Sequence, residues 1–383
     1  MRRRTAEMAP RAGGRRLPLA LLVLLVVGNA AAWRAADGAA RQARGYVEPN
    51  VALHWERLDG NRVRCLLCPR TCTVSPGGRG ACGVRENRGG TYYTLVYGNP
   101  CAVHVDPIEK KPLYHYLPAT KSFSIATAGC NLECRFCQNW QISQSRPEDL
   151  VNQRMSPEDV VEAALASGSR TVAYTYSEPT VFYEYMLDCA KLAHERGLRN
   201  VYHSNGFINA EPLRELCKHM DAANIDLKGF TDEYYRDMAG GSLAPVLRSL
   251  KILREEGVHL EITTLLVPGG NDDPGDLRRM CRWIRENLGP ATPLHFSRFH
   301  PQYKLTNVPP TPVERLELAR RIAMEEGLEF VYIGNVPGHE ANSTYCPGCG
   351  ERVIGRIGYS VDAAGLRGGV CQRCGTVLPG VWE

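Results

Sequence analysis

The sequence predicts an α/β fold in which a parallel sheet forms a full or partial barrel, with one cysteine-rich module before it and another after it. Short apolar runs alternate with amphipathic helical segments across residues 119–340. Repeated βα units of this kind build parallel sheets, and about 220 residues are enough for a barrel. The cysteines are the second observation, because most of the fifteen are clumped within 65–82, 130–137 and 346–374.

The strands and helices are expected to alternate along the chain. Ser156 precedes Pro157 as a helix N-cap, and Pro179, Glu211 and Pro312 stand near the starts of further helices. The expected strands are the apolar runs Phe123–Ala126, Thr171–Tyr176, Asn200–His203, Ala223–Leu227, Leu260–Val267, Leu294–Phe299 and Phe330–Ile333.

Composition divides the chain into five segments. Residues 1–33 are a basic N-terminus followed by an apolar stretch, and residues 34–60 are a linker without a sustained period. We expect residues 61–118 to form an N-terminal four-cysteine module and residues 119–340 to form the barrel. Residues 341–383 then form a C-terminal four-cysteine module of the zinc-ribbon kind.

The net charge of +5 comes from the N-terminus alone. Residues 1–16 hold six arginines and one glutamate, and the rest of the chain sums to zero. A body with balanced charge offers no basic surface to a polyanion, so we expect no nucleic-acid partner.

Residues 17–33 are uncharged and mostly apolar, which is typical of a secretory signal or of a short membrane anchor. The positive-inside rule would keep the N-terminus in the cytoplasm and carry the body across the membrane. Clustered thiolates, however, need a reducing compartment. We therefore expect membrane association through this single segment, with the body and any catalysis in the cytoplasm. Export by the same segment, or a start codon placed too far upstream, are the alternatives.

The most informative stretch holds Cys130, Cys134 and Cys137 in the spacing C-x3-C-x2-C, with Phe136 just before the last cysteine. Thiolates select iron–sulfur clusters or zinc over hard cations. A cubane cluster needs four ligands and this loop supplies three, so one iron would stay open for a ligand that is not protein. A zinc knuckle with a distant fourth ligand is the alternative, although the spacing is not one of the usual paired zinc spacings.

Two further groups of four cysteines flank the predicted barrel. The first group can close a site around zinc or around an auxiliary iron–sulfur cluster, and its spacing does not choose between them. The second group is close to a zinc-ribbon pattern and indicates a structural zinc site. Cys189, Cys217 and Cys281 lie in helical stretches, where a buried apolar role is expected. The two groups are Cys65, Cys68, Cys72 and Cys82, and Cys346, Cys349, Cys371 and Cys374.

The three-cysteine spacing with its aromatic resembles the signature of radical S-adenosylmethionine (SAM) enzymes. Residues 106–115, 129–139, 224–228 and 297–301 are similar to stretches of pyruvate formate-lyase activating enzymes. With both cysteine modules included, the chain resembles the radical SAM member of the AmmeMemoRadiSam gene system over about residues 50–383. The resemblance implies a radical SAM partial (β/α) barrel.

The resemblance also implies which side chains surround the cofactor. In such enzymes SAM is contacted by a polar or Glu-containing stretch after the second strand, an Asp-x-Lys pair, a late histidine and an aromatic near the adenine. In this sequence these roles fall on Phe136, Ser177, Glu178, Asp226, Lys228 and His300. Structural interpretations stay open for several of them. Glu178 can favour a helix dipole, and Asp226 with Lys228 can form a surface ion pair.

The chemistry implied is radical SAM oxidoreductase chemistry. A [4Fe-4S] cluster on the three cysteines would reductively cleave SAM to methionine and a 5′-deoxyadenosyl radical, which abstracts hydrogen from a substrate. The implied partners are a low-potential donor of the flavodoxin or ferredoxin type and an unidentified substrate, with a protein among the candidates. The alternative is an iron–sulfur electron-transfer protein with several clusters and no SAM chemistry. A third hypothesis is a degenerate enzyme that serves as a metal-stabilised scaffold. The presence of all three cysteines of the C-x3-C-x2-C stretch argues against it.

Overall fold

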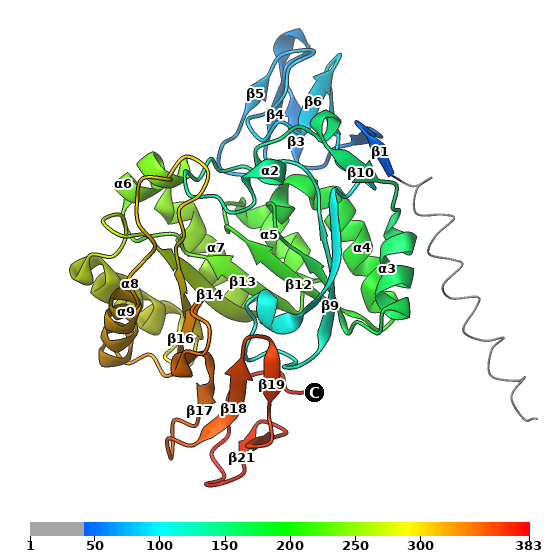
Figure 1. The fold of residues 1–383 in the computed structure, drawn as a ribbon. Helices are drawn as coiled ribbons and strands as arrows, with labels where there is room; N and C mark the ends of the chain where they lie inside the picture. Colours follow the sequence, from blue (N-terminus) through cyan, green and yellow to red (C-terminus); the bar gives the residue numbers. More distant parts are fainter. Residues whose placement is uncertain (1–41) are drawn as a thin grey trace, which may run out of the picture. The chain divides into compact units, whose positions relative to one another are not determined.

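A computed structural model describes residues 42–383, and residues 43–383 form one compact unit (Figure 1). Its centre is an eight-stranded sheet whose spatial order follows the chain. Every neighbouring pair is parallel except the antiparallel pair of β8 and β9. The strands are β8 (Ala102–Pro107), β9 (Lys121–Ala126), β11 (Thr171–Tyr174), β12 (Arg199–Ser204), β13 (Ala222–Asp226), β14 (His259–Leu266), β15 (Leu294–Arg298) and β16 (Val331–Gly334).

The sheet is an open barrel, because β8 and β16 are its two edges and do not pair with each other in the described chain. The predicted fold class is therefore confirmed, and each of the seven predicted strands is present. Strand β8 was not predicted, since its AVHVDP sequence lacks a continuous apolar run. The predicted boundary at residue 118 falls after this strand, and the five-segment division stays a prediction.

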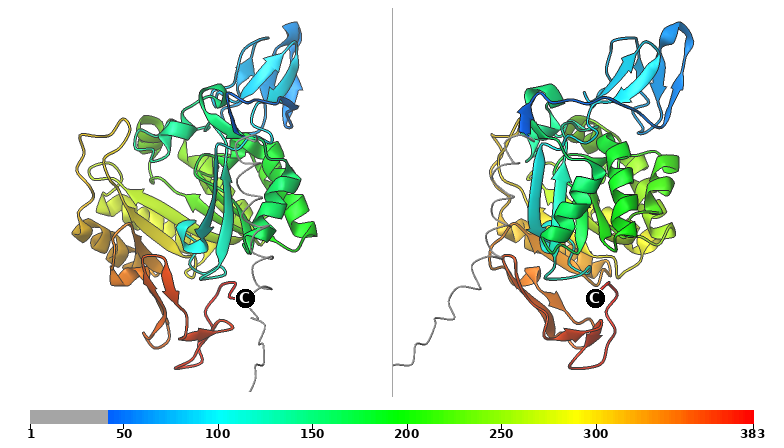
Figure 2. Two further views of the ribbon diagram at one scale, coloured as in Figure 1. Left: turned by 45° about the vertical axis from the view of Figure 1, so that its right-hand side comes forward. Right: turned by 90° about the vertical axis from the view of Figure 1, so that its right-hand side faces the viewer.

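Helices connect the parallel strands and lie along the outer side of the curved sheet (Figures 1 and 2). In α3, Ser156 and Asp159 form a capping box, which satisfies two of the free backbone N–H groups at the helix start. Cys189, Cys217 and Cys281 are buried, as expected. The longer helices are α3 (Pro157–Ala166), α4 (Tyr183–Glu195), α5 (Ala210–Cys217), α7 (Leu243–Glu255), α8 (Pro274–Leu288) and α9 (Val313–Glu325). The short ones are α2 (Trp140–Ser143), α6 (Asp232–Tyr234) and the π-helix η5 (Tyr235–Ala239). The 3-10 turns are η1 (Asp59–Asn61), η2 (Ile108–Lys110), η3 (Pro147–Asp149), η4 (Pro179–Phe182) and η6 (Glu340–Asn342).

The N-terminal module is built from two small antiparallel sheets, β3-β4-β5 and β2-β7-β6. Val63, Val74 and Tyr92 of this module belong to the same cluster of buried side chains as the barrel, so the two share one core. A buried ion pair joins them as well, because the Arg85 guanidinium donates to both carboxylate oxygens of Glu184 at 2.9 and 2.7 Å. The strands are β1 (Gln42–Arg44), β2 (Asn50–Val51), β3 (Trp55–Arg57), β4 (Val63–Cys65), β5 (Thr73–Val74), β6 (Arg85–Arg88), β7 (Thr91–Thr94) and, later in the chain, β10 (Val151–Gln153).

The C-terminal module packs against the amino-terminal ends of the barrel strands. The Val381 N–H of the module donates to the His115 carbonyl at 2.8 Å. His115 and the neighbouring Tyr114 in turn donate their backbone N–H groups to Glu261 of β14, so this segment joins the module to the barrel. Tyr114 and Tyr332 also share a buried cluster with two of the module's cysteines. The strands are β17 (Thr344–Tyr345), β18 (Arg352–Ile357), β19 (Ser360–Asp362), β20 (Leu366–Arg367) and β21 (Val370–Cys371). The module therefore closes the end of the barrel opposite to the carboxyl ends of the strands.

Within residues 42–383, no helix has both the length and the apolar character needed to span a membrane. The predicted anchor at residues 17–33 lies outside the described residues.

We predict that Glu184→Gln lowers the free energy of unfolding by about 3 kcal/mol, because it leaves the buried Arg85 guanidinium without a counter-charge. Urea denaturation followed by circular dichroism measures the change. Glu255→Gln is the matched control, since it breaks an exposed pair with Arg214 and should leave the free energy of unfolding nearly unchanged. Equal effects of the two changes would contradict the prediction.

Candidate functional site

The three-cysteine loop begins where β9 ends, at the carboxyl edge of the sheet. Gly129 precedes the first cysteine with φ +94°, a conformation that side chains disfavour. A Cβ added to Gly129 would lie 2.6 Å from Val84 and 2.9 Å from the Cys82 carbonyl oxygen. Only glycine allows the loop to pass this close to the N-terminal module.

Backbone hydrogen bonds attach the loop to the π-helix η5. Glu133 N–H donates to the Ala239 carbonyl and Arg135 N–H donates to the Met238 carbonyl, both at 2.9 Å. Single π-helical turns are rare and occur often at functional sites. The Asn131 side chain attaches the loop to a second segment by donating to the Phe207 carbonyl at 2.7 Å. The loop is thus held from two sides before any ligand binds.

Cys130 and Cys137 have hydrogen-bond donors beside their sulfurs, whereas Cys134 Sγ lies 4.0 Å from the Ala239 carbonyl oxygen. The Leu132 N–H lies 3.3 Å from Cys130 Sγ, and Ser143 Oγ lies 3.1 Å from Cys137 Sγ. Within residues 42–383, these three sulfurs do not form a group in which all members lie within 4.8 Å of one another. Burial raises the pKa of the Cys134 thiol to about 11, although the Lys228 ammonium acts in the opposite direction. The donor set therefore suits a cluster of several metal atoms, whose positive charge would stabilise the thiolates.

Asp226 and Lys228 form an ion pair beside this loop. Lys228 Nζ donates to Asp226 Oδ2 at 2.9 Å, and His203 Nε2 lies 3.3 Å from Asp226 Oδ1. Although burial opposes it, Lys228 and His203 together hold the pKa of Asp226 well below its usual value. Lys228 Nζ lies 5.9 Å from the ring centroid of Phe136, which is buried and stacked on Tyr234. The predicted residues Phe136, Asp226 and Lys228 thus meet at one place.

Ser177 and Glu178 follow β11 and differ in how their side chains are engaged. Ser177 Oγ is buried and has no hydrogen-bond partner in the described part of the chain, so it can serve a bound ligand. Glu178 accepts hydrogen bonds from Thr180 N–H, Asn205 N–H and the Ser204 hydroxyl at 2.7–3.0 Å. Its carboxylate already caps η4 and joins two strand ends, so the contacts favour a positioning role for it.

His300 is exposed just beyond β15. Its side chain has no hydrogen bond or ion pair with any residue between 42 and 383. The structure places it at the same edge of the sheet as the other predicted residues but not in contact with Asp226 or Lys228.

Three further contributors to the site were not among the predicted site residues. His203 contacts Asp226, Asn205 lies 3.8 Å from Cys130 Sγ, and Arg70 donates to the carbonyls of Asn131 and Gly240. His203 and Asn205 are two apart at the end of β12, so the alternation of a strand could have found them. Arg70 comes from the distant N-terminal module and carries no local signal.

The C-terminal cysteines form a closed four-thiol group. Cys346 Sγ lies 3.6 Å from Cys374 Sγ, and Cys349 Sγ lies 3.8 Å from Cys371 Sγ. A tetrahedral ion with metal–sulfur bonds of about 2.3 Å holds its sulfurs about 3.8 Å apart. The two halves repeat one turn, because Gly350 N–H donates to the Cys346 carbonyl and Gly375 N–H donates to the Cys371 carbonyl. This group fits a single metal ion.

The N-terminal cysteines also gather in one place. Cys65 and Cys68 are buried, while Cys72 and Cys82 are half-buried. Burial raises the pKa of the Cys68 thiol to about 12, and the nearby thiols of Cys65, Cys82 and Cys72 add to the rise. These four therefore lie within electrostatic reach of one another.

Comparison with known proteins identifies the family. The Radical SAM superfamily profile matches residues 124–283. An uncharacterised protein of Methanocaldococcus jannaschii is 49% identical over 315 residues, which cover 82% of this chain and 94% of that protein. The chain belongs to the radical SAM superfamily. A pyruvate formate-lyase 1-activating enzyme of Escherichia coli is 24% identical over 223 residues, which cover 53% of this chain and 89% of that enzyme.

Solved structures give weaker similarities. A radical SAM methyltransferase from Sphaerobacter thermophilus matches 75% of this chain and 76% of its own with a TM-score of 0.45 and 14% identity. Membership of the radical SAM superfamily implies a [4Fe-4S] cluster and SAM, and it supports an enzyme with SAM-cleaving radical chemistry. The Ser177 hydroxyl and the spread sulfurs fit these two cofactors.

We predict that the purified radical SAM protein carries about one zinc ion at the C-terminal group. Cys349→Ala with Cys371→Ala should remove this zinc and lower the melting temperature, because the module then loses the ion that joins its two halves. Elemental analysis and thermal unfolding measure both effects. Cys101→Ala is the control, since Cys101 lies outside all three groups and should leave the zinc content unchanged. Zinc retained in the double variant would contradict the assignment.

Proposed function

We propose that this protein is a radical SAM oxidoreductase whose [4Fe-4S] cluster is held by Cys130, Cys134 and Cys137. The observation that carries the proposal is the loop beside the Asp226–Lys228 pair. The loop itself supplies three thiols, and the charged Asp226–Lys228 pair lies beside it. When bound, the cluster and SAM supply reductive cleavage of the sulfonium to methionine and a 5′-deoxyadenosyl radical that abstracts hydrogen.

The residues around the loop would bind and orient SAM. Lys228 and Asp226 form a fixed pair of opposite charges that suits a zwitterionic ligand. Phe136 offers an apolar face to an adenine ring, and Ser177 offers an unused hydroxyl. Glu178 fixes the end of β12 and so places Asn205 beside Cys130. Closure of the site around the cofactor would exclude water from a reactive radical.

We assign the substrate only by class. The similar proteins include a pyruvate formate-lyase 1-activating enzyme and a benzylsuccinate synthase activating enzyme, whose names say that they activate other enzymes. By analogy, a protein substrate and a flavodoxin- or ferredoxin-type electron donor are proposed here. The second candidate function is an electron carrier without SAM chemistry. The charged group of Asp226, Lys228 and His203 argues against this function, because electron transfer alone does not require such a group.

We propose that the protein associates with a membrane through residues 17–33 and works on the cytoplasmic side. The apolar character of this segment supports its role as a membrane anchor. The cytoplasmic location of the body is supported by the need of clustered thiolates for a reducing compartment.

Cys134→Ala should abolish formation of 5′-deoxyadenosine, because two thiols do not retain a cubane cluster. The protein is reconstituted without oxygen, mixed with SAM and a strong reductant, and its products are separated by chromatography. Cys101→Ala should keep full activity. An intact and reducible cluster that forms no 5′-deoxyadenosine in the unaltered protein would favour the electron carrier.

Asp226→Asn should weaken SAM binding about tenfold, because it removes a charge-assisted contact worth about 1.4 kcal/mol. Equilibrium binding of labelled SAM to the reconstituted protein measures the change. Asp237→Asn is the matched control, since Asp237 pairs with Arg236 on the exposed side of neighbouring η5. Unchanged affinity in Asp226→Asn would remove Asp226 from the SAM site.

A further inference from the structure

The N-terminal module has thiols arranged as in a metal site, which the function proposed above does not use. Cys65 ends β4, Cys72 precedes β5, and Cys68 and Cys82 lie in the loops that follow. The Cys65 N–H donates to the Cys72 carbonyl at 2.9 Å, so the segment between them closes into a loop. The Ala81 N–H lies 3.5 Å from Cys72 Sγ, and backbone donors aimed at sulfur are typical of thiolates that bind metal.

The surroundings of these thiols are polar and only partly satisfied. Arg85 Nε and Tyr92 Oη are buried and have no hydrogen-bond partner within residues 42–383. A Cβ on Gly80 would lie 2.7 Å from Tyr92 Oη and 3.9 Å from Cys72 Sγ. Unused donors near these four thiols, two buried and two half-buried, fit an anionic sulfur-containing group at this place.

The sulfur spacing distinguishes a cluster from a single ion. The C-terminal four-thiol group has its sulfurs as close as one tetrahedral ion requires. In the same described chain, the N-terminal sulfurs do not approach within 4.8 Å as a group. A group of several irons holds its ligand sulfurs farther apart than one tetrahedral ion does, so the N-terminal spacing fits a cluster. The two four-cysteine groups thus differ in how closely their sulfurs lie.

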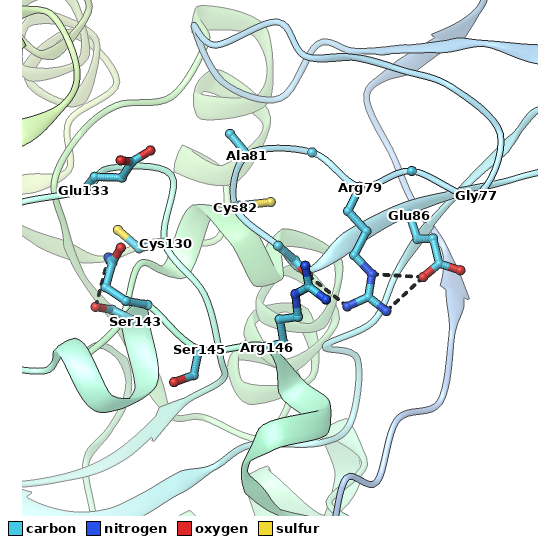
Figure 3. Close-up of a pocket in the computed structure, with 14 residues that line it drawn as sticks. Gly77, Arg79, Ala81, Cys82, Glu86, Cys130, Glu133, Ser143, Ser145 and Arg146 are labelled. Carbon is cyan, nitrogen blue, oxygen red and sulfur yellow. Dashed lines mark hydrogen bonds and ion pairs between the residues drawn. The ribbon is translucent and has the colours of Figure 1, made fainter.

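The N-terminal site lies next to the loop of the SAM cluster. Cys82 and Cys130 line one cavity of about 680 Å³, together with Arg79, Glu133 and Arg146 (Figure 3). The Cys82 carbonyl is in contact distance of Gly129, the residue that precedes Cys130.

A second link comes from the segment between Cys68 and Cys72. There Arg70 donates to the Asn131 carbonyl of the three-cysteine loop and to the Gly240 carbonyl at the end of η5. Two separate segments of the N-terminal site, one around Arg70 and one around Cys82, therefore approach the three-cysteine loop directly.

We propose that Cys65, Cys68, Cys72 and Cys82 hold a second iron–sulfur cluster, which relays electrons to the cluster at Cys130, Cys134 and Cys137. The relay rests on the proposed function, whereas the second cluster does not. A reduced flavodoxin- or ferredoxin-type donor gives one electron to the second cluster. That cluster passes the electron to the cluster at the three-cysteine loop and so returns to its oxidised state.

Iron content after anaerobic reconstitution with ferrous iron and sulfide tests the second cluster. The unaltered full-length protein should bind about eight irons, four for each cubane. A triple Cys130→Ala, Cys134→Ala, Cys137→Ala variant removes the SAM cluster, and the proposal requires that it keep about four irons and a reduced-cluster electron paramagnetic resonance signal. Zinc in place of iron, or no metal at the N-terminal group, would overturn the proposal. Neither result would affect the function proposed for the other loop.

The reverse variant, Cys65→Ala with Cys68→Ala, tests the relay. This variant should keep the iron bound at the three-cysteine loop. Reduced flavodoxin should reduce the cluster at that loop much more slowly than in the unaltered protein, whereas the rate of its direct reduction by dithionite should be unchanged. Equal rates with flavodoxin would overturn the relay. Circular dichroism and retention of the C-terminal zinc verify folding. The milder Cys72→Ser variant, at a half-buried position, provides the same comparison if the double variant does not fold.

Discussion

The structure depends on the way the three-cysteine loop is held. Its backbone is hydrogen-bonded to η5 through Glu133 and Arg135, and the Asn131 side chain joins it to the segment after β12. A loop with fixed backbone presents its thiols in one geometry, so a cluster would bind without reordering the chain. The same fixed backbone places Phe136 and the Asp226–Lys228 pair on one side and the N-terminal module on the other.

The two ends of the barrel differ in what they carry: the candidate site lies at one end, and the C-terminal module covers the other. The carboxyl edge carries the three-cysteine loop, Ser177, and the Asp226–Lys228 pair, as the loops of parallel barrels commonly do. The opposite end is closed by residues 114–117 and by the C-terminal module, with Glu261 accepting the backbone donors of Tyr114 and His115. At that end the His115 ring bonds to Tyr332, and the Arg356 guanidinium donates to Thr344 and to the Tyr114 carbonyl, although Tyr116 Oη and Arg356 Nε have no partner in the described chain. Ser177 Oγ also has no partner there, but it follows β11 at the edge that carries the three-cysteine loop.

Much of this arrangement could be predicted from the sequence. The seven parallel strands were found because buried strands in such sheets are continuous apolar runs, and the cysteine groups were found because their spacing is local. Strand β8 was missed because an edge strand with exposed polar residues has no such run. Arg70 and His203 were missed because their roles arise from contacts between distant segments. The sequence also left Glu178 with two interpretations, and it carried no signal for the three hydrogen-bond donors that its carboxylate meets in the structure.

The close approach at Gly129 makes the choice of residue in the barrel depend on the presence of the N-terminal module. Any side chain at this position would collide with Val84 and the Cys82 carbonyl. A relative that keeps the N-terminal module is therefore expected to keep glycine here for two reasons, the close approach and the positive φ. In a relative without the module only the positive φ still disfavours a side chain, so the constraint on this barrel residue is weaker.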